Sequence, residues 1–142
     1  LIKILQRHSE LNKNAIIPCN YAISDKVGKV AFGLSNYSSG GNSFVMENGA
    51  SEYIEVDTMS IDEFVKIKKL NRVDFIKADI EGAERQLLLG AKETLKEFAP
   101  MISICTYHLP DDPEVLEDLI MKANPKYKIT HKWMKLYAYV NE

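Results

Sequence analysis

The fold of this chain is decided by the stretch VDFIKADIEGAE, residues 73–84. Its first half, residues 73–78, has the apolar content of a buried strand, and the polar Asp79 marks the end of that strand. Residues 83–98 then repeat apolar side chains at helical spacing, which predicts a helix that Pro100 ends. A strand that passes through an acidic turn into a helix is typical of an open α/β sheet.

Strands and helices also alternate on both sides of this stretch. Ser60 followed by Glu63 matches a capping box and predicts that a helix begins near Ile61, and Pro113 suits the first turn of a later helix. The predicted helices cover residues 1–12, 61–68, 83–98 and 113–123, and the predicted strands cover residues 15–24, 30–34, 52–56, 73–78, 101–106, 127–130 and 135–141.

This order of elements predicts the α/β class, with a mostly parallel sheet, a hairpin insertion and a C-terminal antiparallel strand. Ligands of such sheets bind beyond the carboxyl ends of the strands. We therefore expect residues 20–24, 79–84 and 107–108 to be neighbours. Residues 35–50, rich in Gly, Ser and Asn, are a candidate lid, although a plain loop is the favoured interpretation.

Composition and charge narrow the class of protein. A length of 142 residues with 46% hydrophobic and 27% charged residues fits one globular domain. The net charge of -2 argues against a nucleic-acid partner, and the sequence offers no membrane span or signal peptide, so a cytoplasmic domain is expected. Cys19 and Cys105 form no CxxC pair, and we expect both to be small core residues.

The acidic turn is the first candidate for chemistry. Asp79 and Glu81 can bind a metal ion, accept hydrogen bonds from a ligand, or act as a base. Glu84 falls in the first helical turn, where its charge complements the helix dipole. The alternative interpretation is that these acids only cap the helix. Spacing alone leaves both interpretations open.

The same block resembles the FkbM family of S-adenosylmethionine-dependent methyltransferases. The family pattern is a strand ending IK-x-D-x-EG-x-E, then L-x-GA and a proline, and it matches residues 76–84, Leu88 to Ala91 and Pro100. Residues 20–24 (NYAIS) resemble the end of the family's third strand, and residues 41–43 (GNS) resemble its hairpin loop. The resemblance covers nearly all of the chain and implies a Rossmann-like class I methyltransferase fold.

The resemblance also assigns roles to residues. It implies that Asn20, Tyr21 and Ala22 lie along the adenine of the cofactor S-adenosylmethionine. Asp79 would face the methionine end of the cofactor or the acceptor, with Glu81 beside it. Either carboxylate could orient or deprotonate an acceptor hydroxyl. The family often carries a histidine where His108 stands, so we count it with Asp79 and Glu81 as a catalytic candidate, against the alternative of a strand-end histidine bonded to a loop.

The sequence departs from the family pattern at its beginning. None of the glycines forms the G-x-G loop that follows the family's first strand, and the chain opens at Leu1 directly on a helical pattern. We therefore expect residues 1–142 to be a single, partial methyltransferase domain, truncated at the N-terminus. The absent strands would leave a gap or two exposed sheet edges, through which the chain could form a homo-oligomer.

The function expected from these features is O-methylation of a small-molecule or sugar hydroxyl, with the activity of this chain left open. Two alternatives are a noncatalytic oligomerising remnant and a metal-dependent enzyme that uses Asp79, Glu81, Glu84 and His108. The favoured interpretation assigns no residue to a metal. Trp133, Tyr137 and Tyr139 could form a substrate wall, but we expect them to pack in the core and at the sheet edge.

Overall fold

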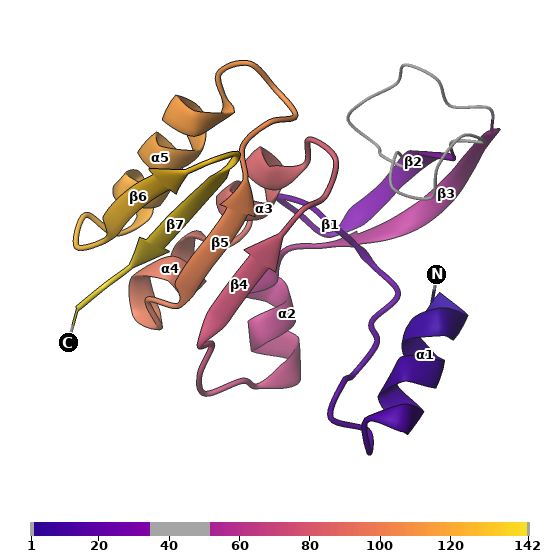
Figure 1. Ribbon diagram of the computed structural model, residues 1–142. Helices are drawn as coiled ribbons and strands as arrows, with labels where there is room; N and C mark the ends of the chain where they lie inside the picture. Colours follow the sequence, from indigo (N-terminus) through magenta and orange to yellow (C-terminus); the bar gives the residue numbers. More distant parts are fainter. Residues whose placement is uncertain (1, 35–51, 142) are drawn as a thin grey trace.

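The computed structural model of the protein describes residues 2–34 and 52–141. Its helices and strands follow one another from the N-terminus to the C-terminus as labelled in Figure 1. They are α1 (Ile2–Leu11), β1 (Ala22–Ile23), β2 (Gly28–Leu34), β3 (Glu52–Met59), α2 (Ile61–Lys68), β4 (Phe75–Ala78), α3 (Glu84–Leu89), α4 (Lys92–Glu97), β5 (Met101–Cys105), α5 (Asp112–Ala123), β6 (Lys128–Lys132) and β7 (Lys135–Tyr139). The candidate lid at residues 35–50 lies outside the described residues.

The strands form two mixed sheets, so the prediction of one mostly parallel sheet was wrong. The larger sheet has the order β4-β5-β7-β6, and only its β4–β5 pair is parallel. The smaller sheet has the order β1-β3-β2, with β1 parallel and β2 antiparallel to β3. The turn at Trp133 and Met134 returns β7 directly alongside β6, which makes this pair antiparallel. β7 also runs antiparallel to β5. The expected hairpin insertion, β2 with β3, is confirmed.

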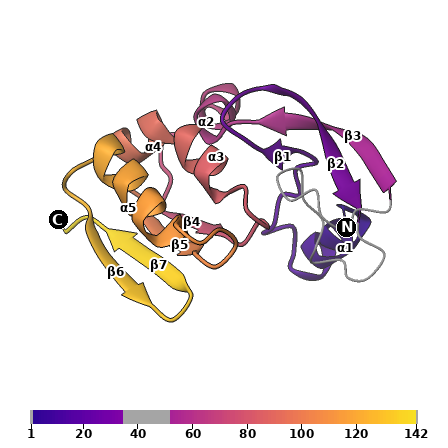
Figure 2. The ribbon, with the colours of Figure 1, turned by 90° about the horizontal axis from the view of Figure 1, so that it is seen from above.

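The core lies on one face of the larger sheet. Figure 2 shows α3, α4 and α5 together on that side of the strands. Alternation along each strand sends every second side chain into this layer. The buried cluster includes Ile76, Ala78, Ile102, Ile104, Leu136 and Ala138 from the strands, and Leu87, Leu88, Leu95, Leu116 and Ile120 from the helices. On the opposite face the larger side chains Phe75, Met101, Tyr137 and Tyr139 remain exposed.

The single helix predicted over residues 83–98 is two helices, α3 and α4, separated at Gly90 and Ala91. The break comes from tertiary contacts. The Gly90 carbonyl accepts a hydrogen bond from the Asp62 backbone N–H at 2.8 Å. The Asp62 carboxylate in turn accepts from the backbone N–H groups of Glu93 (3.1 Å) and Thr94 (2.8 Å). Asp62, a residue of α2, therefore caps the N-terminus of α4, which lets a new helix begin at Lys92.

Of the strand predicted over residues 15–24, only Ala22–Ile23 form a strand, β1. The preceding segment follows α1 instead, and the Ser9 hydroxyl donates a hydrogen bond to the Ile16 carbonyl. Pro18 lacks an N–H for a strand ladder, and both Ile17 and Cys19 are exposed. Cys19 is therefore not a core residue, whereas Cys105 is buried as expected.

Helix α2 occupies the residues that the capping box predicted. The Ser60 hydroxyl accepts a hydrogen bond from the Glu63 N–H at 3.2 Å, and α2 runs from Ile61 to Lys68. Among the described residues, none of the helices combines the length and hydrophobicity needed to cross a bilayer.

Substitution of Gly90 tests the packing that joins the two sheets. A Cβ atom on Gly90 would collide with the Ser24 carbonyl oxygen and lie 2.9 Å from the Ser60 Cβ. We therefore expect Gly90→Ala to lower the free energy of unfolding by about 1–3 kcal/mol, the usual cost of overpacking. Gly28→Ala is the control, because its Cβ would meet Thr58 at an ordinary 3.6 Å. Urea denaturation measures both, and equal stabilities would contradict the tight packing at Gly90.

Candidate active site

The acidic turn between β4 and α3 is held in an uncommon backbone conformation. Glu81 has φ of 54° and Gly82 has φ of 94°. Glycine accepts this region freely, but a residue with a side chain carries a cost of about 1 kcal/mol or more. The Glu84 carboxylate accepts a hydrogen bond from the Ile80 N–H at 2.9 Å and so closes the turn. This geometry holds the carboxylates of Asp79 and Glu81 at the end of β4.

His108 lies at the centre of these carboxylates. It follows β5, the parallel neighbour of β4, and its side chain is 3% exposed. Nδ1 lies 3.2 Å from Glu84 Oε1. Nε2 lies 3.8 Å from Asp79 Oδ1 and 3.7 Å from Glu81 Oε2. Neither ring nitrogen makes a hydrogen bond within the described residues. The imidazole therefore has the buried carboxylate of Glu84 beside Nδ1, and the carboxylates of Asp79 and Glu81, which are less buried, near Nε2.

Tyr107 stabilises the charged form of Asp79. Its hydroxyl donates a 2.8 Å hydrogen bond to Asp79 Oδ1. Burial by itself would raise the pKa of Asp79, but hydrogen bonds from Tyr107 and Cys105 and the charges of His108 and Lys77 outweigh it and hold the pKa below its usual value. The same hydrogen bond, together with burial, raises the pKa of Tyr107. Asp79 is therefore an ionised acceptor at neutral pH, and Tyr107 is a neutral donor.

An ion-pair network fixes the loop that carries His108. Asp112 is buried, and its two oxygens accept hydrogen bonds from Arg85 Nε (2.9 Å) and the Leu109 N–H (2.8 Å). Arg85 also pairs with Asp111 at 2.6 Å, which lowers the pKa of Asp111. Arg85 belongs to α3 and the two aspartates to the start of α5. The network thereby fastens the loop after β5 to the helix that follows the acidic turn.

Beside Asp79 lies an open pocket of about 450 Å³, and the β6–β7 turn forms part of its wall. Its lining combines aromatic, basic and acidic side chains: Asp79, Cys105, Tyr107, Lys132, Trp133, Met134, Lys135 and Tyr137. Trp133 stands in the turn with φ of 61° and is 92% exposed. Tyr137 and Tyr139 are exposed as well, so the expectation that these three side chains pack in the core and at the sheet edge was wrong. The turn carries the indole off the sheet and into the pocket wall.

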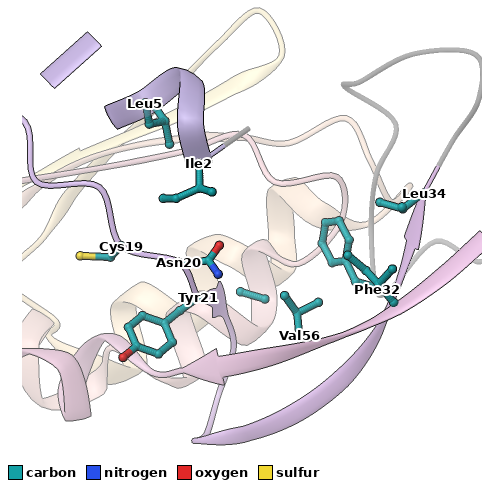
Figure 3. Close-up of a pocket in the computed structure, with 10 residues that line it drawn as sticks. Ile2, Leu5, Cys19, Asn20, Tyr21, Phe32, Leu34 and Val56 are labelled. Carbon is teal, nitrogen blue, oxygen red and sulfur yellow. The ribbon is translucent and has the colours of Figure 1, made fainter. Parts of the chain in front are cut away.

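A second pocket, of about 440 Å³, lies between α1 and the β2–β3 hairpin. Figure 3 shows the side chains of Ile2, Asn20 and Val56 turned toward a common space. The walls are mainly apolar, and Asn20 contributes an amide. The full lining is Ile2, Leu5, Cys19, Asn20, Tyr21, Ala22, Phe32, Leu34, Ile54 and Val56. Asn20, Tyr21 and Ala22, which the family resemblance assigns to the adenine, therefore line one pocket.

The predicted neighbourhood of three strand ends is realised only in part. The structure brings Asp79, Glu81 and His108 together, as expected for the carboxyl ends of β4 and β5. Residues 20–22 line the other pocket, because β1 pairs with β3 in the smaller sheet rather than with β4. The two groups therefore belong to different sheets.

Sequence reasoning missed Arg85 and Asp112, and it gave Glu84 only a helix-dipole role or a place in the alternative metal site. Glu84 was placed at a helix dipole, yet its side chain is buried and lies against His108. The sequence signal was its position in the first helical turn, three residues after Glu81. Arg85 and Asp112 gave no signal, because 27 residues separate them and only the fold makes them partners.

Comparison with known proteins places the chain among methyltransferases. The sequence profile described as the Methyltransferase FkbM domain matches residues 4–139. Hexuronic acid methyltransferase AglP of Haloferax volcanii is 26% identical over 126 residues, which are 89% of this chain and 51% of that protein. The 2-O-methyltransferase NoeI of Sinorhizobium fredii is 33% identical over 89 residues, which are 52% of this chain and 37% of that protein.

A solved structure shares the fold. The crystal structure of Methyltransferase FkbM from Methylobacillus flagellatus KT superimposes with a TM-score of 0.65 over 96% of this chain and 32% of that chain, at 22% sequence identity. This likeness supports the α/β fold. The chain spans about half the length of AglP and less of the other two proteins.

Removal of the Tyr107 hydroxyl tests the electrostatics of the acidic turn. We expect Tyr107→Phe to raise the pKa of Asp79 toward its usual value, because the carboxylate loses its strongest hydrogen-bond donor. Carboxyl-carbon NMR titration measures this pKa directly. Tyr139→Phe is the control, since Tyr139 is an exposed tyrosine of β7 that lies outside the pocket.

The same substitution has a pH signature in stability. A carboxyl whose pKa is lowered on folding stabilises the fold above its unfolded pKa of about 3.9, and this contribution is lost as pH falls through the lower folded pKa. The stability advantage of the wild type over Tyr107→Phe should therefore shrink on acidification. An unchanged Asp79 pKa in the variant would contradict the assignment.

Proposed function

The chain belongs to the FkbM methyltransferase family, and we propose that the protein transfers a methyl group from S-adenosylmethionine to a sugar hydroxyl. The observation that carries the proposal is the convergence of Asp79, Glu81 and His108 beside an open pocket with aromatic and basic walls. We further propose that the two sheets belong to a Rossmann-like arrangement of the class I methyltransferase type.

The pocket between α1 and the hairpin fits the adenosine part of the cofactor. Its volume of about 440 Å³ lies within the range of small-molecule sites. Phe32, Ile54 and Val56 offer apolar surface to a flat base, and the Asn20 amide offers both a donor and an acceptor for its edge. In this assignment Tyr21 and Ala22 form the rest of the wall. The cofactor, when bound, supplies an electrophilic methyl group.

The acidic turn suits the acceptor. Methyl transfer to oxygen needs an aligned hydroxyl and a group that takes up its proton. The ionised Asp79 can accept the hydrogen bond of the hydroxyl. Glu81 and His108, whose Oε2 and Nε2 atoms are 3.7 Å apart, are the candidates to receive its proton. Tyr107 keeps Asp79 in place through its 2.8 Å hydrogen bond.

The pocket beside Asp79 favours an anionic sugar. The exposed Trp133 ring offers a flat apolar face for a sugar ring, and Lys132 and Lys135 line the same pocket. Neither lysine takes part in an ion pair within the described part of the chain, so both can pair with a carboxylate of the acceptor. A hexuronic acid, the substrate class in the name of AglP, combines both features.

Methyl transfer by the whole gene product tests the proposed function. We expect labelled S-adenosylmethionine to methylate hexuronate glycosides faster than neutral hexosides. Asp79→Asn should lower the rate by about 100-fold or more, the usual size of a positioned acid–base group, without unfolding the domain. The control Asp118→Asn removes the same charge from the exposed face of α5 and should leave the rate unchanged.

Two outcomes of this assay would count against the proposal. Unchanged turnover in Asp79→Asn would remove Asp79 from the mechanism. A folded wild-type protein that methylates no sugar in the panel would overturn the proposed reaction.

Calorimetric titration with S-adenosylhomocysteine tests the cofactor pocket separately. We expect micromolar binding, about -8 kcal/mol, to the whole gene product. Asn20→Ala should weaken it about tenfold through the loss of one hydrogen bond to the base. Ile17→Ala is the control, because Ile17 is a strongly exposed neighbour that does not line the pocket. Equal affinities in the two variants would place the adenosine elsewhere.

A further inference from the structure

We propose that Asp79, Glu81 and His108 bind a divalent metal ion of the Mn²⁺ or Zn²⁺ type. One ligand atom from each side chain lies within 4.8 Å of the other two. His108 Nε2 is 3.8 Å from Asp79 Oδ1 and 3.7 Å from Glu81 Oε2. The binding site rests on this geometry, and only its use in catalysis rests on the proposed function.

The orientation of His108 is the observation that singles out this cluster. Its side chain is almost completely buried, yet within the described residues neither ring nitrogen makes a hydrogen bond. A buried polar group without a partner costs about 1–3 kcal/mol. Because Nε2 faces two carboxylates, a cation placed between the three groups would satisfy the nitrogen and balance both negative charges.

Glu84 lies where the supporting partner of a metal-binding histidine ordinarily lies. Such a histidine donates its other ring N–H to a carboxylate or carbonyl, which fixes the tautomer and the ring orientation. Here Glu84 Oε1 lies 3.2 Å from Nδ1, and the Ile80 N–H holds that carboxylate in place. With the proton on Nδ1, the lone pair of Nε2 points toward Asp79 and Glu81.

A second cluster, made of Glu84, His108 and Asp112, is less suited to a metal. Both oxygens of Asp112 already accept hydrogen bonds, from Arg85 and from the Leu109 N–H. Glu84 and Asp112 are also closed off from solvent. In the proposed site, by contrast, the side chains of Asp79 and Glu81 are 40% and 30% exposed, which leaves a path for the ion and positions for water.

The donor set indicates the kind of ion. One imidazole nitrogen and two carboxylate oxygens suit Mn²⁺ and Zn²⁺, whereas Mg²⁺ favours oxygen alone. Cys105 is close to Asp79, but burial first and then Asp79 raise the pKa of its thiol, so it is a poor thiolate donor. Ligand atoms at about 2.1 Å from an ion lie about 3–3.5 Å apart, so each carboxylate needs to approach His108 Nε2 by a few tenths of an ångström.

Within the proposed function, the ion has a direct use. The pocket lined by Trp133 and Lys135 opens beside Asp79, so an acceptor hydroxyl there could take a remaining coordination position. A bound cation lowers the pKa of a coordinated oxygen acid. Glu81 and His108 would then hold the ion instead of taking the proton, so the O–H bond would break with its proton passing to water. The acceptor oxygen would form a bond to the methyl carbon while the C–S bond breaks, and the electron pair of that bond would leave on the sulfur of S-adenosylhomocysteine.

Titration of the metal-stripped protein with Mn²⁺ alone, followed by the EPR signal of the free ion, tests the site without cofactor or acceptor. We expect one site of micromolar affinity, displaced by Zn²⁺ and only weakly by Mg²⁺. Asp79→Asn and His108→Gln should each weaken Mn²⁺ binding at least tenfold. The matched controls Asp118→Asn and His131→Gln alter exposed groups that pair with Lys122 and Glu117, and they should bind as the wild type does.

Stability separates loss of the ligand from loss of the fold. His108 is buried, so His108→Gln changes the core as well as the site. Glu81→Gln changes a partly exposed carboxylate and should keep the fold while weakening Mn²⁺ binding. No binding up to millimolar Mn²⁺, or binding that all three variants retain, would overturn the metal site. Methyl transfer that persists without Mn²⁺ binding would overturn the site alone. Mn²⁺ binding without methyl transfer would leave the site standing and overturn the proposed function.

Discussion

The fully buried carboxylate of Glu84 is the constraint on which the rest of the site depends. Removal of a carboxylate from water is costly, and the fold offsets that cost with a hydrogen bond from the Ile80 N–H and the nearby His108 Nδ1. These two partners belong to different strand ends, those of β4 and β5. Glu84 therefore fixes the acidic turn and the imidazole with respect to each other, which neither strand could do alone.

The groups around Glu84 have two different roles: an ion pair holds the loop in place, and partly exposed carboxylates face the solvent. Arg85 and Asp112 are joined at 2.9 Å and fasten α3 to the beginning of α5, so the loop that carries His108 has little freedom. Asp79 and Glu81 keep partial contact with solvent. A rigid, buried support behind exposed, charged side chains is the arrangement that both acid–base chemistry and metal binding require.

Local sequence signals predicted local structure well, and tertiary contacts account for the errors. The Ser60 capping box lies within one helical turn, so it placed α2 correctly. Two predictions were wrong because partners distant in sequence determine the structure. The predicted helix over residues 83–98 is divided because Asp62 caps α4. The predicted strand over residues 15–24 is short because Ser9 bonds the segment before β1. The rule that ligands bind beyond the carboxyl ends of strands likewise placed Asp79, Glu81 and His108 together. It could not show that Glu84 turns inward, since that depends on the position of His108.

The separation of the two sheets bears directly on how a methyl group could reach its acceptor. The pocket of Asn20 belongs to the smaller sheet, and the acidic turn belongs to the larger one. Their relative position depends on the close approach of Gly90 to Ser24 and on the Asp62–Gly90 hydrogen bond. Because methyl transfer is governed mainly by alignment, a small shift at Gly90 should affect the rate more than it affects the stability of either sheet. In the proposed function, the packing at Gly90 is therefore part of the geometry that aligns the methyl group with its acceptor.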